Sequence, residues 1–151
     1  MKVIILLFLM LLANSCTIRN NTSNQANDTR EKKIEKIELR EQTRGTNRSF
    51  VLNSENLIIT LNEKVNDSKI SLLEWENIEK QINYIDLSKI SSFEAPTTDH
   101  YSDQSLASTI IITSSGKTHQ SSSFDAGNPP KELAPLYKAI QQVIQSKKTT
   151  Q

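Results

Sequence analysis

The alternation of apolar and polar positions predicts three strands in the first half of the chain. Residues 34–42 place apolar side chains among charged ones, which is typical of a strand with one buried face, although the first half of this run also fits a helix. Residues 49–52 fit a second strand, residues 57–61 are apolar and rich in β-branched side chains, and each stretch follows a short polar turn. We therefore expect an antiparallel meander of three strands.

A helix with clear end signals is predicted to follow, with Ser71 as its N-cap. Ser71 and Glu74 have the spacing of a capping box, in which each side chain accepts a hydrogen bond from the other residue's backbone N–H group. Apolar residues then recur every three or four positions, which predicts one buried stripe along the helix. The stripe consists of Trp75, Ile78, Ile82 and Ile85.

A β-hairpin is predicted in the second half of the chain. Its strands, residues 109–113 and 117–124, are joined by the turn Ser114–Gly116. This pairing places His119 opposite Ile112. The polar loop before the hairpin, residues 96–105, carries several side chains that are able to bind ligands.

A last helix completes the predicted fold. Its regular part is expected to begin near Pro135, because a proline farther inside a helix would clash with the preceding turn, and a frayed polar tail is expected at 147–151. The order βββ-α-ββ-α predicts an α+β fold, an antiparallel sheet of about five strands with two helices packed on one face. We expect a single domain over residues 31–146.

The charge balance and the cysteine content limit the classes of function. The chain has 18 Lys and Arg against 17 Asp and Glu, so it offers no excess of positive charge for binding nucleic acid, and we expect no such partner. A single cysteine excludes an intramolecular disulfide and a zinc site built from several thiolates. The position of that cysteine is more informative than its number.

The first fifteen residues have the features of a secretory signal. A short basic start, Met1–Lys2, precedes an uncharged apolar run over Val3–Ala13. As a helix this run would span about 16 Å, against roughly 30 Å for the hydrocarbon core of a bilayer. The run is therefore too short for a lasting transmembrane anchor and fits the apolar core of a signal peptide.

The end of this segment, Leu12–Cys16, resembles the lipobox of bacterial lipoprotein precursors, although Asn14 departs from its commonest form. The resemblance implies cleavage of the signal peptide, residues 1–15, before Cys16. It also implies a diacylglycerol on the Cys16 sulfur and a palmitate-type acyl chain on the new amino group. An ordinary secretory signal that happens to end in a cysteine is the alternative.

Processing at Cys16 would leave a lipid as the link to the membrane. The mature chain would have 136 residues (151 − 15) and, without Lys2, equal numbers of basic and acidic residues. Residues 16–30 are almost entirely polar, which predicts a disordered tether about 20 Å long. We expect attachment to the outer membrane, facing the periplasm, with an envelope protein or a small ligand as a further partner.

Four polar residues are the candidates for a site. His100, Asp103, His119 and Asp125 could converge into a nitrogen–oxygen metal site or a hydrolytic centre, but no sequence motif specifies one. The Phe124–Pro130 segment, together with the turns near Gly45 and Pro96, resembles small uncharacterised bacterial lipoproteins over residues 44–144. That resemblance implies no activity.

These observations lead to two hypotheses of different kinds. Because no catalytic motif is present and Cys16 would be acylated, we predict a non-enzymatic binding or structural module of the cell envelope, without catalytic residues, metal or cofactor. The alternative is a small metal-dependent or hydrolytic envelope enzyme that uses His100, Asp103, His119 and Asp125.

Overall fold

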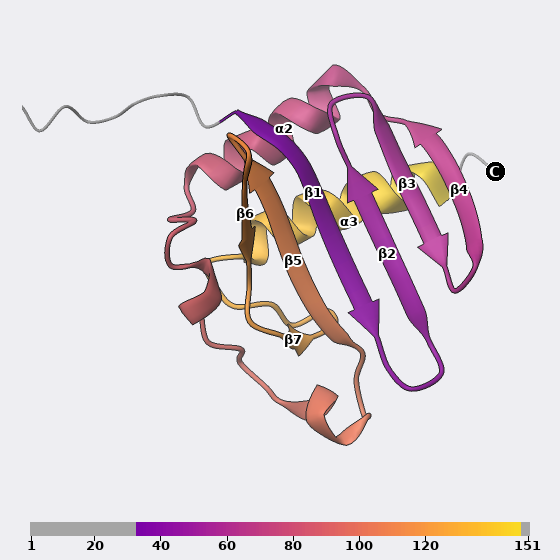
Figure 1. Ribbon diagram of the computed structural model, residues 1–151, viewed down its shortest axis with the longest axis vertical. Helices are drawn as coiled ribbons and strands as arrows, with labels where there is room; N and C mark the ends of the chain where they lie inside the picture. Colours follow the sequence, from indigo (N-terminus) through magenta and orange to yellow (C-terminus); the bar gives the residue numbers. More distant parts are fainter. Residues whose placement is uncertain (1–32, 149–151) are drawn as a thin grey trace, which may run out of the picture. The chain divides into compact units, whose positions relative to one another are not determined.

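Seven strands and two α-helices build the part of the chain that the computed structural model describes, residues 33–148 (Figure 1). The strands are β1 (Ile34–Gln42), β2 (Asn47–Leu52), β3 (Asn56–Leu61), β4 (Lys64–Lys69), β5 (Ala107–Ser114), β6 (Lys117–Gln120) and β7 (Phe124–Asp125). The helices are α2 (Leu72–Asn83) and α3 (Ala134–Lys148), with two short 3₁₀ helices, η1 (Ile90–Ser92) and η2 (Asp99–Ser102). The predicted signal peptide 1–15, the lipidation site Cys16 and the tether 16–30 lie outside the described residues.

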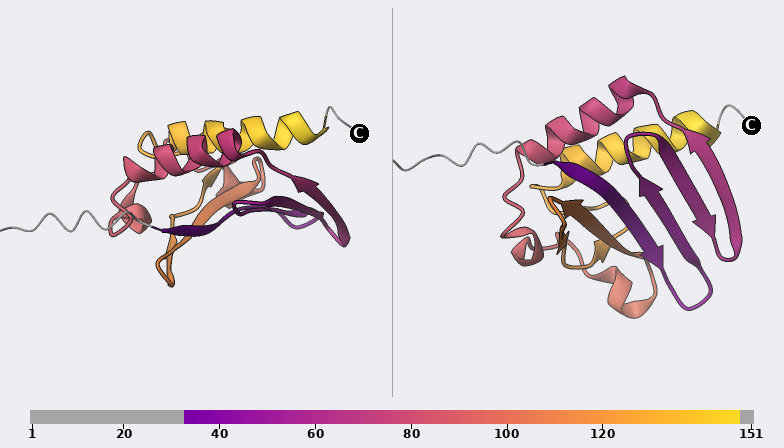
Figure 2. Two further views of the ribbon diagram at one scale, coloured as in Figure 1. Left: turned by 90° about the horizontal axis from the view of Figure 1, so that it is seen from above. Right: turned by 45° about the horizontal axis from the view of Figure 1, so that its top comes forward.

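The strands form one antiparallel sheet in the order β4-β3-β2-β1-β5-β6, with β7 paired to β5. Helices α2 and α3 lie side by side on one face of the sheet (Figure 2). The predicted α+β class is therefore confirmed. Within residues 33–148, no helix is long and apolar enough to cross a membrane.

The prediction of about five strands was too low, because two strands lack a hydrophobic signal. Every residue of β4 except Ser68 is exposed, and its one apolar side chain, Val65, is 62% exposed. An edge strand without a buried face gives no alternation to detect. Strand β7 has only two residues, and the strand predicted over 117–124 is interrupted between Gln120 and Phe124.

The core lies between the sheet and the two helices. Ile37 pairs with Ile112 and Leu39 pairs with Ile110 across β1 and β5, and all four side chains are fully buried. The pairing of His119 with Ile112 is as predicted. The helices add the expected apolar stripes, which include Trp75, Ile78, Ile82, Ile85, Leu133, Leu136, Tyr137, Ile140 and Ile144.

The predicted capping box at the start of α2 is present. The Ser71 hydroxyl accepts the Glu74 N–H at 3.3 Å, and the Glu74 carboxylate accepts the Ser71 N–H at 2.7 Å. The same carboxylate also accepts a bond from the Lys147 ammonium at 2.9 Å. This ion pair gives Lys147 a fixed partner, and α3 continues to Lys148, so the expected fraying from residue 147 onwards does not occur at these two positions.

Several hydrogen bonds hold the Glu74 carboxylate in its charged form. Desolvation by partial burial would raise its pKa, but the Ser71 N–H, the Lys147 ammonium and two hydroxyl groups together lower that pKa from 4.5 to about 2. Glu74 therefore stabilises the fold above its ordinary pKa, and its contribution is lost as the pH falls toward about 2.

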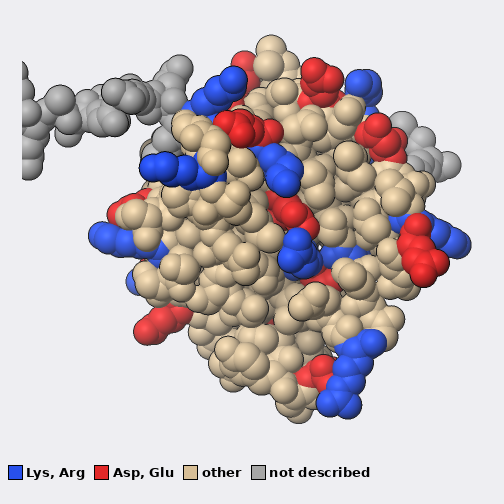
Figure 3. Space-filling model, viewed as in Figure 1, with Lys and Arg blue, Asp and Glu red and all other residues tan. Residues whose placement is uncertain are grey.

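The helix-free face of the sheet carries charges of both signs. Figure 3 shows Lys and Arg side chains interspersed with Asp and Glu, both at the centre and at the margins of this face. No continuous patch of a single sign is visible on this face in the described part of the chain.

Candidate functional site

The four candidate residues all lie in, or contact, one stretch of chain, the connection between α2 and β5. This connecting segment, residues 84–106, contains η1 and η2 and runs along the edge of the sheet formed by β6 and β7 (Figure 1). Helix η1 contacts β6, and η2 contacts β7. Long connections without regular structure need contacts of this kind to keep a fixed path.

The strongest of these contacts surrounds the carboxylate of Asp125 in β7. It accepts hydrogen bonds from the backbone N–H groups of Asp99 at 3.0 Å and His100 at 2.7 Å. The ring nitrogen Nδ1 of His100 lies 2.5 Å from the same carboxylate, and the hydroxyl of Thr97 donates a further bond. The Asn128 amide in turn donates to the Thr97 hydroxyl at 2.9 Å. One carboxylate thus fixes four donors of the connecting segment.

These donors keep Asp125 ionised. Burial alone would raise the pKa of its carboxyl group, but the bonds from Thr97, His100 and Asp99 outweigh that effect and hold the pKa well below its ordinary range. An ionised carboxylate only accepts hydrogen bonds, so Nδ1 of His100 carries the hydrogen and donates it.

The other ring nitrogen of His100 has no partner. Nε2 is buried and forms no hydrogen bond with another described residue. The Tyr101 ring packs against the imidazole, with ring centroids 4.2 Å apart, while Tyr101 itself is 79% exposed. A carboxylate at Nδ1 also orients histidines that catalyse or bind metals, but here Nε2 does not reach solvent in the described structure.

Asp103 and His119 make their contacts elsewhere. Asp103 caps η2 in the left-handed conformation, with φ of 58°, and forms a 2.9 Å ion pair with Arg44 in the turn between β1 and β2. His119 in β6 places Nδ1 at 3.0 Å from the backbone oxygen of Leu87. The structure therefore brings His100 and Asp125 together, whereas Asp103 and the contact of His119 with Leu87 lie at separate points of the connecting segment.

Within residues 33–148, no group of three or more His, Cys, Asp or Glu side chains lies close enough to hold a metal ion. The shared property of the four candidates is different from the one expected. Each of them, or its bonded partner, lies in the connecting segment and fixes a different position: Leu87, residues 97–100, or Asp103.

Sequence reasoning missed three residues that do the same work. Ser122, which follows β6, donates a hydrogen bond to the backbone oxygen of Ser91 at 2.6 Å. Thr97 and Asn128 complete the cluster at Asp125. These partners are 28 or 31 positions apart in the chain, so no local pattern of spacing reveals them.

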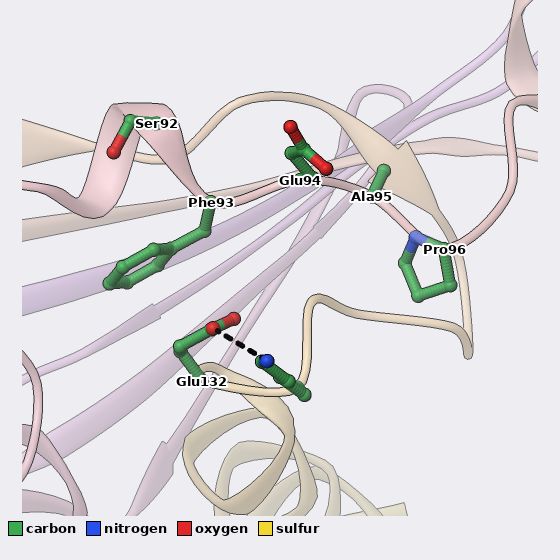
Figure 4. Close-up of a pocket in the computed structure, with 7 residues that line it drawn as sticks. Ser92, Phe93, Glu94, Ala95, Pro96 and Glu132 are labelled. Carbon is green, nitrogen blue, oxygen red and sulfur yellow. Dashed lines mark ion pairs between the residues drawn. The ribbon is translucent and has the colours of Figure 1, made fainter.

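A groove of about 400 Å³ opens beside this cluster (Figure 4). One side is formed by residues 92–96 of the connecting segment, and Lys131 and Glu132, which precede α3, lie opposite. The groove does not include His100 or Asp125, but Thr97 follows its last wall residue directly. The bonds of Thr97 to Asp125 and Asn128 therefore fix one end of the groove.

The backbone of the groove wall is unusually open. Phe93 has extended dihedral angles, φ −70° and ψ 126°. The N–H and C=O groups of residues 93–95 form no hydrogen bond with another described residue. Phe93 and Ala95 are half-buried and Glu94 is exposed, so these backbone groups are free to pair with an extended chain that lies along the groove.

Comparison with known proteins adds nothing to this geometry. No family model, no curated protein and no solved structure matches the chain. Function has to be inferred from the chain's own residues.

Proposed function

We propose that this protein is a lipid-anchored bacterial envelope protein whose α+β domain binds a partner and does not catalyse a reaction. The groove between residues 92–96 and Lys131–Glu132 is its binding surface. The observation that carries the binding role is the unpaired backbone of residues 93–95 at the wall of this groove.

The lipid anchor rests on the N-terminal sequence. An apolar run of signal-peptide length ends in Leu12–Cys16, which resembles a lipobox, and a polar stretch of tether length follows. Two or three acyl chains bind a bilayer firmly, at about 0.8 kcal/mol for each buried CH₂ group. The nearly balanced charge of the chain offers no polybasic alternative, so the proposed attachment depends on Cys16.

The binding role is favoured by the way the polar candidates are used. The carboxylates of Asp125 and Asp103 and the Nδ1 atoms of His100 and His119 are all engaged in bonds within the domain. Those bonds fix the connecting segment and, through Thr97, the end of the groove. The polar groups of these residues thus hold the surface around the groove in a fixed shape.

One experiment in a bacterial host tests both parts of the proposal. The full chain is expressed as the wild type, as Cys16→Ala and as Thr17→Ala, a control just outside the lipobox, with alkyne-labelled palmitate in the medium. We expect label in the wild type and the control and none in Cys16→Ala. Equal labelling of Cys16→Ala, or an unlabelled wild type, contradicts the lipid anchor.

The same cells are treated with a cross-linker, and the captured proteins are compared for the wild type, Glu94→Lys and Glu63→Lys. Glu94 lines the groove, whereas Glu63 lies in the turn between β3 and β4. Cross-linked envelope partners should be lost in Glu94→Lys and kept in Glu63→Lys. Identical capture by all three chains would show that the groove is not the binding surface.

A further inference from the structure

The open backbone at residues 93–95 is fixed at both ends. On one side, the Ser122 hydroxyl bonds the Ser91 backbone oxygen at 2.6 Å, and on the other, Thr97 bonds Asp125 and Asn128. Residues 93–95, between these two points, are held in place although no strand of the described structure pairs with them. A binding surface that is already ordered loses little conformational entropy when a partner binds.

The side chains of this stretch divide between the core and the groove. Phe93 and Ala95 are half-buried and pack against the hydrophobic core, whereas Glu94 between them is exposed. In an extended chain, neighbouring side chains point to opposite sides, so the backbone edge stays free for pairing. Figure 4 shows Glu132 across the hollow from residues 93–96, and Lys131 also lines the groove.

The groove has an excess of negative charge. Glu94 forms no ion pair with another described residue. Glu132 forms an ion pair with Lys131, with 3.8 Å between the carboxylate oxygen and the ammonium nitrogen. Two carboxylates and one ammonium group thus line the groove. A Lys or Arg side chain is the complement of this arrangement. A single exposed ion pair contributes little free energy, so it sets a preference for one side chain, and backbone pairing supplies most of the affinity.

We propose that the groove binds an extended peptide of a partner protein by strand addition. The peptide backbone pairs with residues 93–95, and a Lys or Arg side chain of the peptide lies against Glu94. This inference rests on the proposed binding role of the groove and specifies the class of its partner. A hollow of about 400 Å³ has room for a few side chains of a strand.

A library of phage-displayed random heptapeptides tests the proposal on the protein as it is processed in the bacterial host, purified in detergent. The wild type should enrich peptides that have Lys or Arg at one position among β-branched residues. Glu94→Lys should enrich an acidic residue there, and the control Glu63→Lys should keep the basic preference. No enrichment by the wild type, or the same basic preference in Glu94→Lys, overturns the proposal.

A second arm tests backbone pairing on the best enriched peptide. N-methylation of its alternate backbone amides removes more than one donor without changing side chains. We expect binding to weaken at least about tenfold, since each lost hydrogen bond changes affinity by up to about that factor and several are lost together. Equal binding of the methylated peptide overturns strand addition. A synthetic peptide of residues 17–32 is included, and binding of that peptide alone would identify the chain's own N-terminal part as the occupant and overturn the partner assignment.

Failure of this inference is distinguishable from failure of the proposed function. If cross-linked envelope partners depend on Glu94 while no peptide is enriched, the groove binds something other than a strand, and only the peptide proposal is wrong. If neither assay depends on Glu94, both proposals are wrong.

Discussion

Asp125→Ala should destabilise the domain more than any other single substitution among the four candidate residues. The change removes the acceptor of bonds from the Asp99 and His100 N–H groups, from Nδ1 of His100 and from the Thr97 hydroxyl. The His100 ring is buried, so its Nδ1–H would lose its partner without gaining water. Buried donors without acceptors are among the costliest defects in a fold.

Urea unfolding at several pH values measures this effect. Because the folded-state pKa of Asp125 lies below its ordinary value, its contribution is fully present above about pH 4 and is lost as the pH falls through the lowered pKa. The difference between wild type and Asp125→Ala should therefore be largest near neutral pH and should shrink in acid. Asp103→Asn is the matched control, since asparagine tolerates the left-handed conformation and the exposed ion pair of Asp103 with Arg44 contributes at most about 1 kcal/mol. A difference no larger than that of Asp103→Asn would contradict the account.

Arg48→Met is expected to have the second large effect, at the buried carboxylate of Glu41 in β1. It leaves the Glu41 carboxylate, only 1% exposed, without the guanidinium that now binds it at 2.6 Å. The hydroxyls of Ser108 and Tyr137 remain as donors at 3.3 Å, and burial and the Glu41 charge raise the pKa of Tyr137, so that its hydroxyl stays protonated. We expect a loss of about 2–3 kcal/mol, below the usual cost of breaking a buried ion pair, because Arg48 is partly exposed.

A double variant separates the buried charge from simple loss of packing. Glu41→Gln combined with Arg48→Met removes both charges, keeps similar volumes and keeps an amide oxygen as acceptor for the Ser108 and Tyr137 hydroxyls, so its stability in urea unfolding should return to within about 1 kcal/mol of the wild type. A double variant as unstable as Arg48→Met alone would show that the uncompensated carboxylate is not the cause.

The parts of the fold that could be predicted from the sequence are those with one buried face. Alternation in β1 and the helical stripe that starts at Trp75 reflect burial directly, so both were found at nearly the observed positions. Strand β4 is solvated on both faces, and its only guides are pairing with β3 and a turn at Asn62, where φ is 54°. Neither leaves a periodic signal.

The site was harder to predict because its contacts join distant positions. His100 and Asp125 are 25 residues apart, and polar loops contain many residues of the same types. One signal was present and not used. Alternation after Ile37 and Leu39 places Glu41 on the buried face, and the hairpin register then puts Arg48 opposite it. Pairing across a predicted hairpin can therefore identify a buried charge and its partner from sequence.

The central claim is that the connecting segment is fixed at Asp125 while residues 93–95 keep an open backbone. Amide hydrogen exchange, resolved by residue in the wild-type chain, tests it most directly. We expect the amides of Phe93, Glu94 and Ala95 to exchange at nearly the rate of an unstructured peptide, and those of Asp99 and His100 to exchange far more slowly. Slow exchange at residues 93–95 in the free protein, or fast exchange at Asp99 and His100, would contradict the account.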